Sequence, residues 1–367
     1  MAVFVVKIGT STLVDVTGRF REDVLEARVR DLVRIQRQGH RPVLVTSAAI
    51  ACGLAQLGIA ERPTALPDLQ AASAVGQGVL FERYLQAFRG HDVVPAQVLL
   101  TSRDLERRAS YVNARNTLQR LIEFGAIPVI NENDTTTTDD ITFGDNDVLA
   151  AQVAILLRAG WLLLLTDRDG LYGPGPDGPV LIGDVPAGTL PEDVELAPMS
   201  GSGHGRGGIS SKIASASMAT AAGITCVIGN GAVDGVITQV AHGGHVGTRF
   251  PPTPRPRSAF KLWLRYAKPT MGRIDVDAGA ARAIESRGTS LLAVGVTGSH
   301  GVFAAGDAVD VADPTGRVIG KGISGLSAEE VRHVAGMSTT DLRARLPGAP
   351  NEVIHRDQFV LVGADVV

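Results

Sequence analysis

The sequence predicts an α/β protein whose mainly parallel, open sheet is sandwiched by helices, followed by a small β-rich C-terminal domain. From residue 1 to about 245, short aliphatic and β-branched runs alternate with longer segments of helical period, which is the pattern of βαβ units. Four prolines between residues 251 and 256 then favour extended backbone. Beyond them the chain carries short Gly- and Val-rich strand-like runs. We expect an α/β domain over residues 1–248, a Pro/Arg-rich linker over 249–264 and a β-rich domain over 265–362.

The elements of the first domain follow from this alternation. Strands are expected at Val3–Ile8, Pro42–Thr46, Val93–Leu99, Ile127–Ile130, Trp161–Leu165 and Thr225–Ile228. Helices are expected near Glu22–Gln38, Leu69–Phe88, Tyr111–Phe124, Val148–Arg158 and Ser210–Ala222. In the first of these helices the apolar residues form one stripe, and Gly39 suits the left-handed position after its end.

Composition excludes several protein classes. The 367 residues are 44% apolar and 20% charged, values typical of a globular protein rather than a disordered tail or a membrane protein. The most apolar stretch, Val148–Leu165, is interrupted by Gln152 and Arg158, so a membrane span is rejected. The N-terminus lacks the features of a signal peptide. Cys52 and Cys226 have no metal or redox spacing, which suits the cytosol.

The charge balance gives no global reason to bind a polyanion. Lys and Arg number 35 against 38 Asp and Glu, a net charge of −3. Any anionic ligand must therefore be bound by a local arrangement of residues.

Polar residues follow four of the expected strands. They are Lys7–Ser11, Thr46–Ser47, Asn131–Asp134 and Thr166–Asp167. One such segment alone is more often an ordinary surface turn. In an open parallel sheet, however, the carboxyl ends of the strands lie along one edge, where ligands bind at the switch in strand order. Four segments together favour a shared site.

A glycine-rich segment, Ser200–Gly208, precedes the last expected helix of this domain. Successive backbone amides of such a loop can face one concavity, and the helix N-terminus adds positive partial charge, so phosphate is a plausible ligand. A flexible surface linker is the alternative interpretation. The segment is not a Walker A sequence, so ATP would bind by another design.

Two lysines suit phosphoryl transfer, in which a protein mainly positions groups and neutralises charge on the transferring oxygens. Lys7 lies at the first strand exit and Lys212 at the start of the late helix. Gly144–Asp147 could orient these lysines, hold substrate or cap the helix that follows, and Asp147 is the preferred functional member. The polar segment Thr135–Asp140 reads as an exposed loop, a candidate lid, and no metal-ligand spacing is present in it.

These segments, in their order and spacing, resemble the glutamate 5-kinases of the amino acid kinase family, which carry an appended PUA domain. The resemblance covers essentially the whole chain. It rests on residues 6–11, 46–51, 130–134, 144–147, 166–172 and 207–212.

The resemblance implies an amino acid kinase fold and transfer of the γ-phosphoryl group of Mg-ATP to the side-chain carboxylate of L-glutamate, the first step of proline biosynthesis. It implies catalytic roles for Lys7, Lys212 and Asp147. It implies glutamate binding by Ser47, Asn131, Asp134 and Asn146. It implies ATP binding by Lys7, Thr166, Asp167, Arg206, Gly207, Gly208, Ile209, Ser210, Ser211 and Lys212. A cytoplasmic homo-oligomer, feedback inhibition by proline and coupling to glutamate-5-semialdehyde dehydrogenase are implied as well.

Two positions depart from the family pattern. Ala48 stands where the family usually has glycine, so the strand-to-helix turn must accommodate a Cβ atom there. Arg206 stands where a small residue is common, and it could contact a phosphate or point to solvent.

Two alternatives remain at this point. One is a related kinase for aspartate, N-acetylglutamate or a nucleoside monophosphate. The other is an RNA-binding protein acting through the PUA domain, but residues 270–345 carry eight Lys and Arg against nine Asp and Glu, 8 − 9 = −1. That net charge gives little attraction to a phosphate backbone and disfavours RNA binding as a main function.

Overall fold

A computed structural model describes residues 1–15, 17–101, 104–105, 108–136, 146–186, 189, 191, 194–196, 208–253, 261, 264–265 and 270–361. The chain divides into two compact units, Met1–Arg257 and Ser258–Val367. The predicted domain limits remain a prediction, because the boundary between the units falls in a proline-rich region that is mostly outside the described residues.

The first unit is built on a seven-stranded sheet with the order β3-β4-β2-β1-β5-β8-β9. The strands are β1 (Val3–Ile8), β2 (Arg41–Thr46), β3 (Pro95–Leu100), β4 (Ile127–Glu132), β5 (Trp161–Thr166), β8 (Thr225–Asn230) and β9 (Thr248–Phe250). All neighbours pair in parallel except β8 and β9. The order runs outward from β1 in both directions, so the switch point lies between β1 and β5. The predicted fold class is confirmed.

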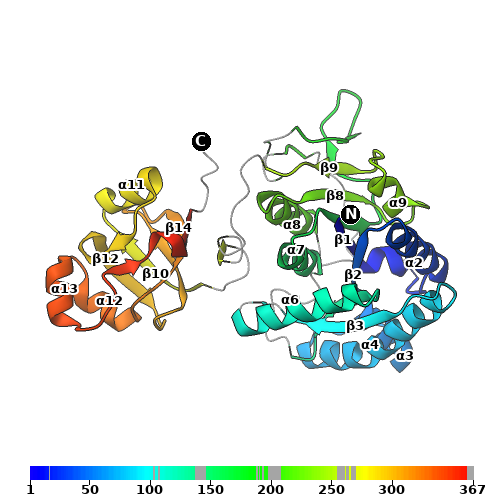
Figure 1. Ribbon diagram of the computed structural model, residues 1–367, viewed down its shortest axis with the longest axis horizontal. Helices are drawn as coiled ribbons and strands as arrows, with labels where there is room; N and C mark the ends of the chain where they lie inside the picture. Colours follow the sequence, from blue (N-terminus) through cyan, green and yellow to red (C-terminus); the bar gives the residue numbers. More distant parts are fainter. Residues whose placement is uncertain are drawn as a thin grey trace. The chain divides into compact units, whose positions relative to one another are not determined.

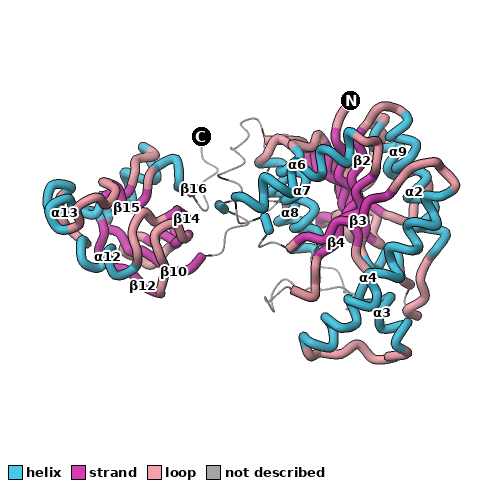
Figure 2. Tube along the Cα trace, turned by 60° about the horizontal axis from the view of Figure 1, so that its bottom comes forward, coloured by secondary structure: helices cyan, strands magenta, loops and turns pink. Residues whose placement is uncertain are grey.

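Helices cover both faces of this sheet (Figures 1 and 2). On one side α6 (Arg108–Glu123), α7 (Asn146–Leu157) and α8 (Ile209–Ala221) pack in series. On the other side α9 (Val236–Ala241) packs on α2 (Glu22–Arg37), which also contacts α4 (Leu66–Arg89). Short segments complete the unit: α1 (Thr10–Leu13), α3 (Ala49–Leu57), β6 (Tyr172–Gly173) and β7 (Val180–Leu181).

The alternation of side chains along β1 decides which face each residue serves. Phe4, Val6 and Ile8 are fully buried and belong to the core that includes the apolar stripe of α2. Because side chains alternate across a strand, Val5 and Lys7 point to the opposite face. That face is covered by α7, and the lysine is therefore directed at the start of a helix rather than into the α2 core.

Helix α7 is buried on all sides, because it lies between α6 and α8 and against β1, β2 and β5. Almost all of its residues are apolar and inaccessible, which explains why its sequence lacks a polar face. The polar pair Asn146 and Asp147 at its first turn is also buried. Such residues need partners, and these partners define the candidate site.

The second unit holds a five-stranded sheet with the order β12-β10-β13-β14-β16. Its strands are β10 (Thr270–Val276), β12 (Val296–Gly301), β13 (Ala308–Ala312), β14 (Val318–Ile323) and β16 (Phe359–Leu361), with β11 (Leu291–Leu292) and β15 (Glu352–Ile354) forming a separate pair. The helical segments are α11 (Ala278–Arg287), η3 (Ala293–Gly295), α12 (Ala328–Val334), α13 (Thr339–Arg345) and η4 (Arg356–Gln358). The predicted β-rich character is confirmed.

The six strands predicted in the first domain are present within a few residues, and Gly39 takes the expected left-handed conformation, with φ +89°. The described elements of the first unit that the sequence did not predict are all short: α1, α3, β6, β7, α9 and β9. Within the described part of the chain, no helix is both long and apolar enough to span a membrane.

Candidate active site

The exits of β4, β2, β1 and β5 are consecutive along one edge of the sheet, because these strands are neighbours in that order. The polar segments that follow them therefore converge, as the sequence pattern predicts. Helix α7 begins beneath this edge and contacts all four strands. Two groups of side chains form there, one charged and one neutral.

The charged group consists of two lysines that share one carboxylate. Lys7 Nζ lies 2.6 Å from Asp147 Oδ1, and Lys212 Nζ lies 2.9 Å from Asp147 Oδ2. The lysines come from β1 and from the first turn of α8, segments about 200 residues apart in sequence. Two cations held by one anion leave a local excess of one positive charge, which suits an anionic ligand. We call this group the lysine–carboxylate cluster.

Electrostatics fix the ionisation of this cluster. Asp147 is fully buried, and burial alone would raise its pKa, but the charges and hydrogen bonds of Lys7 and Lys212 outweigh burial and lower the pKa below its usual value. The carboxylate therefore stays ionised at neutral pH. Its role is to hold the two ammonium groups rather than to accept a proton.

The neutral group is centred on the amide of Asn146. Its Nδ2 lies 2.7 Å from Asn131 Oδ1, 3.0 Å from Ser47 Oγ and 2.6 Å from the carbonyl oxygen of Thr46. These partners lie at the carboxyl ends of β4 and β2, so one amide joins the ends of two strands to α7. We call this group the amide cluster. It contains no charge.

The other amide atom, Asn146 Oδ1, is buried and finds no hydrogen-bond partner among the described residues. The three acceptors around Nδ2 fix the orientation of the amide, so the free atom is the oxygen. A buried acceptor without a donor is costly. It is suited to receive a hydrogen bond from a ligand that carries N–H or O–H groups.

A second carboxylate, Asp134, lies just beyond β4 and is almost inaccessible. Ser73 Oγ, from α4, donates to Asp134 Oδ2 at 2.5 Å. Burial raises the pKa of Asp134, while the hydrogen bond from Ser73 and the charge of Arg62 act in the opposite direction. Because burial prevails here, a cationic ligand group would stabilise the ionised form of Asp134.

The exit of β5 contributes the remaining polar residues. Asp167 Oδ1 accepts hydrogen bonds from Thr166 Oγ1 at 3.0 Å and from Ser11 Oγ at 3.2 Å. Ser11 belongs to α1, directly after β1, so the exits of the two strands at the switch point are tied together. Because both hydroxyl protons are donated to Asp167, the carboxylate and the hydroxyl lone pairs at this position suit the O–H groups of a ribose as acceptors.

Comparison with known proteins shows the family to which the chain belongs. The sequence model of the amino acid kinase family matches residues 2–230, and that of the PUA domain matches residues 272–346. The chain belongs to the amino acid kinase family. It is 43% identical over 362 residues to the glutamate 5-kinase of Synechococcus sp. (strain JA-3-3Ab), covering 98% of both chains. It is also 43% identical to the glutamate 5-kinase of Myxococcus xanthus, covering 98% of this chain and 96% of that one.

Among solved structures, Giardia carbamate kinase has a TM-score of 0.48 and 16% identity, covering 68% of this chain and 98% of that one.

Several of the predicted ATP-binding residues of this amino acid kinase lie at the start of α8. Gly208 precedes the helix, and Ile209, Ser210 and Ser211 form its first turn ahead of Lys212. Arg206 and Gly207 lie outside the described residues, as do Gly144, Asp145 and the candidate lid residues 137–140. Their predicted roles stay predictions.

Ala48, the departure from the family's glycine, adopts the left-handed conformation with φ +84°. Its side chain is buried in the same apolar core as Phe4 and Leu25. The methyl group therefore packs in the apolar core. The turn accommodates Cβ through backbone strain of about 1 kcal/mol, partly offset by burial of the methyl group.

Sequence analysis did not identify Ser73 and Arg62 as functional, and it left Ser11 without a role. Ser73 lies on α4, where Gly53 of α3 and Gly76 of α4 allow a close approach, since a Cβ on Gly53 would lie 1.7 Å from the carbonyl oxygen of Ala72. The sequence around Ser73 does not predict its hydrogen bond with Asp134. A role for Ser11 could have been predicted from the sequence, because this residue belongs to the first of the polar segments that follow the strands.

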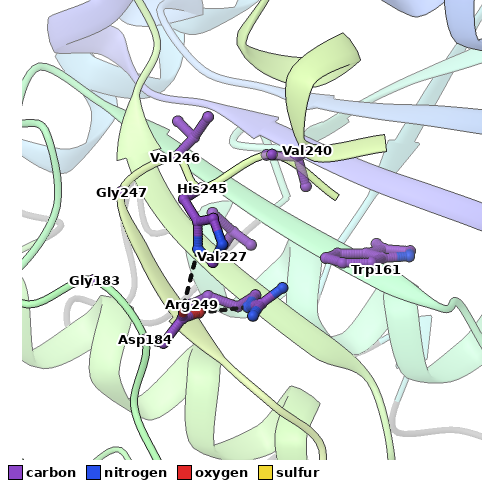
Figure 3. Close-up of a pocket in the computed structure, with 10 residues that line it drawn as sticks. Trp161, Gly183, Asp184, Val227, Val240, His245, Val246, Gly247 and Arg249 are labelled. Carbon is purple, nitrogen blue, oxygen red and sulfur yellow. Dashed lines mark hydrogen bonds and ion pairs between the residues drawn. The ribbon is translucent and has the colours of Figure 1, made fainter. Parts of the chain in front are cut away.

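One cavity of about 10 Å³ borders the amide cluster, because Thr46 and Asn131 line it together with residues of α4. A second cavity lies elsewhere in this kinase unit. The cavity in Figure 3 measures about 20 Å³ and is lined by Trp161, Val227, Val240 and the side chains around Asp184. Asp184 pairs there with Arg249 Nε at 2.6 Å and with His245 Nδ1 at 2.9 Å. These residues belong to β5, β8, α9, β9 and the loops near them, and none belongs to the lysine–carboxylate or amide cluster. The cavity has room for about one water molecule.

Proposed function

We propose that this protein transfers the γ-phosphoryl group of ATP to the side-chain carboxylate of L-glutamate, giving L-glutamyl 5-phosphate and ADP. The observation that carries the proposal is the adjacency of Asn146 and Asp147 at the start of α7. One joins the neutral amide cluster and the other the lysine–carboxylate cluster. A substrate held by the first cluster has its reactive end presented to the second.

Lys7 and Lys212 act on the transferring group. A side-chain carboxylate oxygen of glutamate attacks the γ-phosphorus, the bond to the bridging oxygen of ADP breaks, and negative charge is spread over the oxygens between them. Two ammonium groups held in place by Asp147 stabilise that charge without reorganising. No general base is required, because the nucleophile is already ionised at neutral pH.

The glutamate subsite combines Asp134 with the amide cluster. The α-ammonium group of glutamate adds a cation beside Asp134, whose burial outweighs the charge of Arg62, and its N–H groups suit the free Asn146 Oδ1. Ser47 and Asn131 orient that amide and complete the polar wall. This assignment favours an amino acid with a free α-ammonium group over N-acetylglutamate.

The nucleotide subsite lies at the switch point and the start of α8. The first turn of α8, including Ile209, Ser210 and Ser211, supplies backbone groups for phosphate oxygens. Thr166 and Asp167 supply acceptors for the ribose hydroxyls. Mg²⁺ would enter on the phosphates of ATP, since the described residues contain no cluster of three candidate ligands and both oxygens of Asp147 are engaged by lysines.

The test uses the reactivity of the product, because an acyl phosphate is trapped by hydroxylamine as a coloured hydroxamate. Purified protein is incubated with Mg-ATP, hydroxylamine and one of L-glutamate, L-aspartate or N-acetyl-L-glutamate. We expect ATP-dependent hydroxamate with L-glutamate at a rate well above the other two acids. A signal with L-aspartate or N-acetyl-L-glutamate but not with L-glutamate would overturn the proposal.

The similarity to glutamate 5-kinases supports two further proposals, a homo-oligomeric enzyme and inhibition by proline. It also supports coupling to glutamate-5-semialdehyde dehydrogenase, which would consume the labile acyl phosphate. Proline keeps the α-carboxylate and a protonated nitrogen, so Asp134 can bind it as it binds glutamate. The name of the curated relatives supports the pathway.

A further inference from the structure

One arginine is buried in the interior of the first unit, far from the two clusters described above. Arg28 lies in the middle of α2 and is 1% exposed. Its Nη1 donates to the carbonyl oxygens of Gly231 at 2.8 Å and Val233 at 2.5 Å. Asp31 Oδ2 lies 3.4 Å from Nη2. The guanidinium therefore binds the backbone of the turn between β8 and α9.

That turn is in direct contact with the exit of β5. The N–H of Gly231 donates to the carbonyl oxygen of Thr166 at 2.7 Å. Asn230 Nδ2 donates to Asp169 Oδ1 at 2.9 Å, two residues beyond Asp167. A continuous path of hydrogen bonds thus runs from Arg28 through the turn to the proposed nucleotide subsite.

The start of the turn, at Gly231, is closely packed, whereas the residues from Ala232 to Asp234 are exposed. A Cβ on Gly231 would lie 2.6 Å from Thr12 Cγ2 and 3.1 Å from Leu165 Cβ, so its backbone packs against both strand exits at the switch point. A displacement of Gly231 by a few tenths of an ångström must be transmitted to α1 or to the end of β5. These are the segments that carry Ser11 and Thr166.

Packing alone does not account for an arginine at this position. Burial lowers the pKa of Arg28 despite the nearby carboxylates of Asp31 and Asp234, which means that the charged form is poorly compensated. Its Nε and Nη2 atoms find no hydrogen bond among the described residues. An apolar residue of similar length would avoid this cost. The two carbonyl contacts are what the guanidinium specifically provides.

We propose that Arg28 is a positioning residue for the nucleotide subsite, acting through the Gly231–Val233 carbonyls on Thr166 and Asp167. The inference rests on the proposed function, and it adds that ATP binding depends on a residue on the opposite face of the sheet. Glutamate binding does not depend on it, because the amide cluster lies on β2, β4 and α7, outside this path.

The test compares the double variant Arg28→Met/Asp31→Asn with the single variant Asp31→Asn. The double variant removes both buried charges together, so no unpaired ion destabilises the fold. The single variant is the matched control, because it keeps the guanidinium and its carbonyl contacts. For each protein, the Kd of a non-hydrolysable ATP analogue is measured by calorimetry, and the KM values for ATP and glutamate by steady-state kinetics.

We expect the double variant to weaken analogue binding and raise the KM for ATP by about fivefold or more relative to the control, with the KM for glutamate within about twofold. Analogue binding within about twofold of the control would overturn the inference, as would an equal rise in both KM values. Failure of the wild-type protein to bind the analogue would instead contradict the proposed function.

A third variant, Arg28→Lys, keeps the inference testable if the double variant does not fold by circular dichroism. A lysine retains the charge but offers a shorter reach and no planar fork. We expect a rise in the KM for ATP smaller than fivefold but above twofold, again without change for glutamate. An unchanged KM for ATP in this variant would contradict the positioning role.

Discussion

The lysine–carboxylate cluster and the amide cluster meet at two consecutive residues, yet they are held together in opposite ways. Asp147 is flanked by two ammonium groups, which lower its pKa despite complete burial. Asn146 is held by neutral acceptors, and the nearby Asp134 keeps a raised pKa because burial prevails over its partners. The protein supplies two counter-charges to Asp147 in the first cluster. Asp134, three residues beyond Asn131 of the second cluster, remains poorly compensated, and a cationic substrate group would stabilise its ionised form.

This difference predicts a division of labour. A cluster that is electrostatically complete before substrate arrives is preorganised, and its charges act on the transition state. A cluster with an unmatched acceptor gains most from the ground-state substrate. Changes in the first should lower kcat, and changes in the second should raise the KM for glutamate.

The largest effect is expected for Asp147→Asn. The change leaves two buried or half-buried lysines without their carboxylate, and we expect a loss of about 3–5 kcal/mol in the free energy of unfolding at pH 7. Because the folded-state pKa of Asp147 is lowered, its stabilisation is fully present above the unfolded pKa and disappears as pH falls through the folded value. Urea unfolding at pH 7, 5 and 3 should show the two proteins converging only below pH 3.8. A difference that vanishes already at pH 5 would contradict the assigned electrostatics.

Lys212→Ala is expected to lower kcat by roughly 100-fold or more, with a much smaller rise in the KM for glutamate. The reason is that the ammonium group acts on charge developing in the transition state. Steady-state kinetics with saturating ATP give both values. A kcat near that of the wild type with only ATP affinity reduced would show that Lys212 binds the ground state.

Asp134→Ala is expected to raise the KM for glutamate by about tenfold while kcat changes less, since the variant loses the partner of the α-ammonium group. The same variant should lose inhibition by proline if the two ligands share the subsite. Asp169→Ala, a carboxylate at the nucleotide end, is the matched control and should leave the KM for glutamate unchanged. Weakened glutamate binding with unchanged proline inhibition would require separate sites.

A smaller effect is expected for Ala48→Gly. Glycine relieves the left-handed strain but loses the buried methyl group and gains unfolded-state entropy, so the free energy of unfolding should change by less than about 1 kcal/mol. The KM for glutamate should stay within about twofold, because the methyl group points into the core. A several-fold change in that KM would show that Ala48 shapes the amide cluster after all.

The smallest effect is expected when the chain is ended near Pro254. Both clusters are built entirely from the first unit, so glutamate-dependent ADP release should stay within about twofold of that of the full chain. Circular dichroism checks that the shortened protein is folded. A folded but inactive protein would mean that the second unit takes part in shaping the site.

The sequence predicted the parallel sheet, the polar strand exits and their convergence, because hydrophobic period and strand order are local or general properties. Lys7 and Lys212 were recognisable from their places after a strand and at a helix start. Ser73 and Arg28 were not recognisable, because each is one polar residue in an ordinary helical pattern. Their partners, Asp134 and Gly231, lie far away in the sequence. The short helix α3 was missed because its first residues read as part of the strand-exit motif.

The adjacency of Asn146 and Asp147 also limits the length of substrate that the site fits. Their Cα atoms are joined by one peptide unit, about 3.8 Å, and their side chains diverge by about 100° around the helix axis. In the proposed binding mode Asn146 faces the α-carbon end of the substrate and Asp147 holds the lysines that act on its other end, so covalent geometry sets the spacing of these two residues. Repacking of neighbouring side chains cannot shorten it, so changing the preferred chain length of the acid would require rebuilding the start of α7 itself.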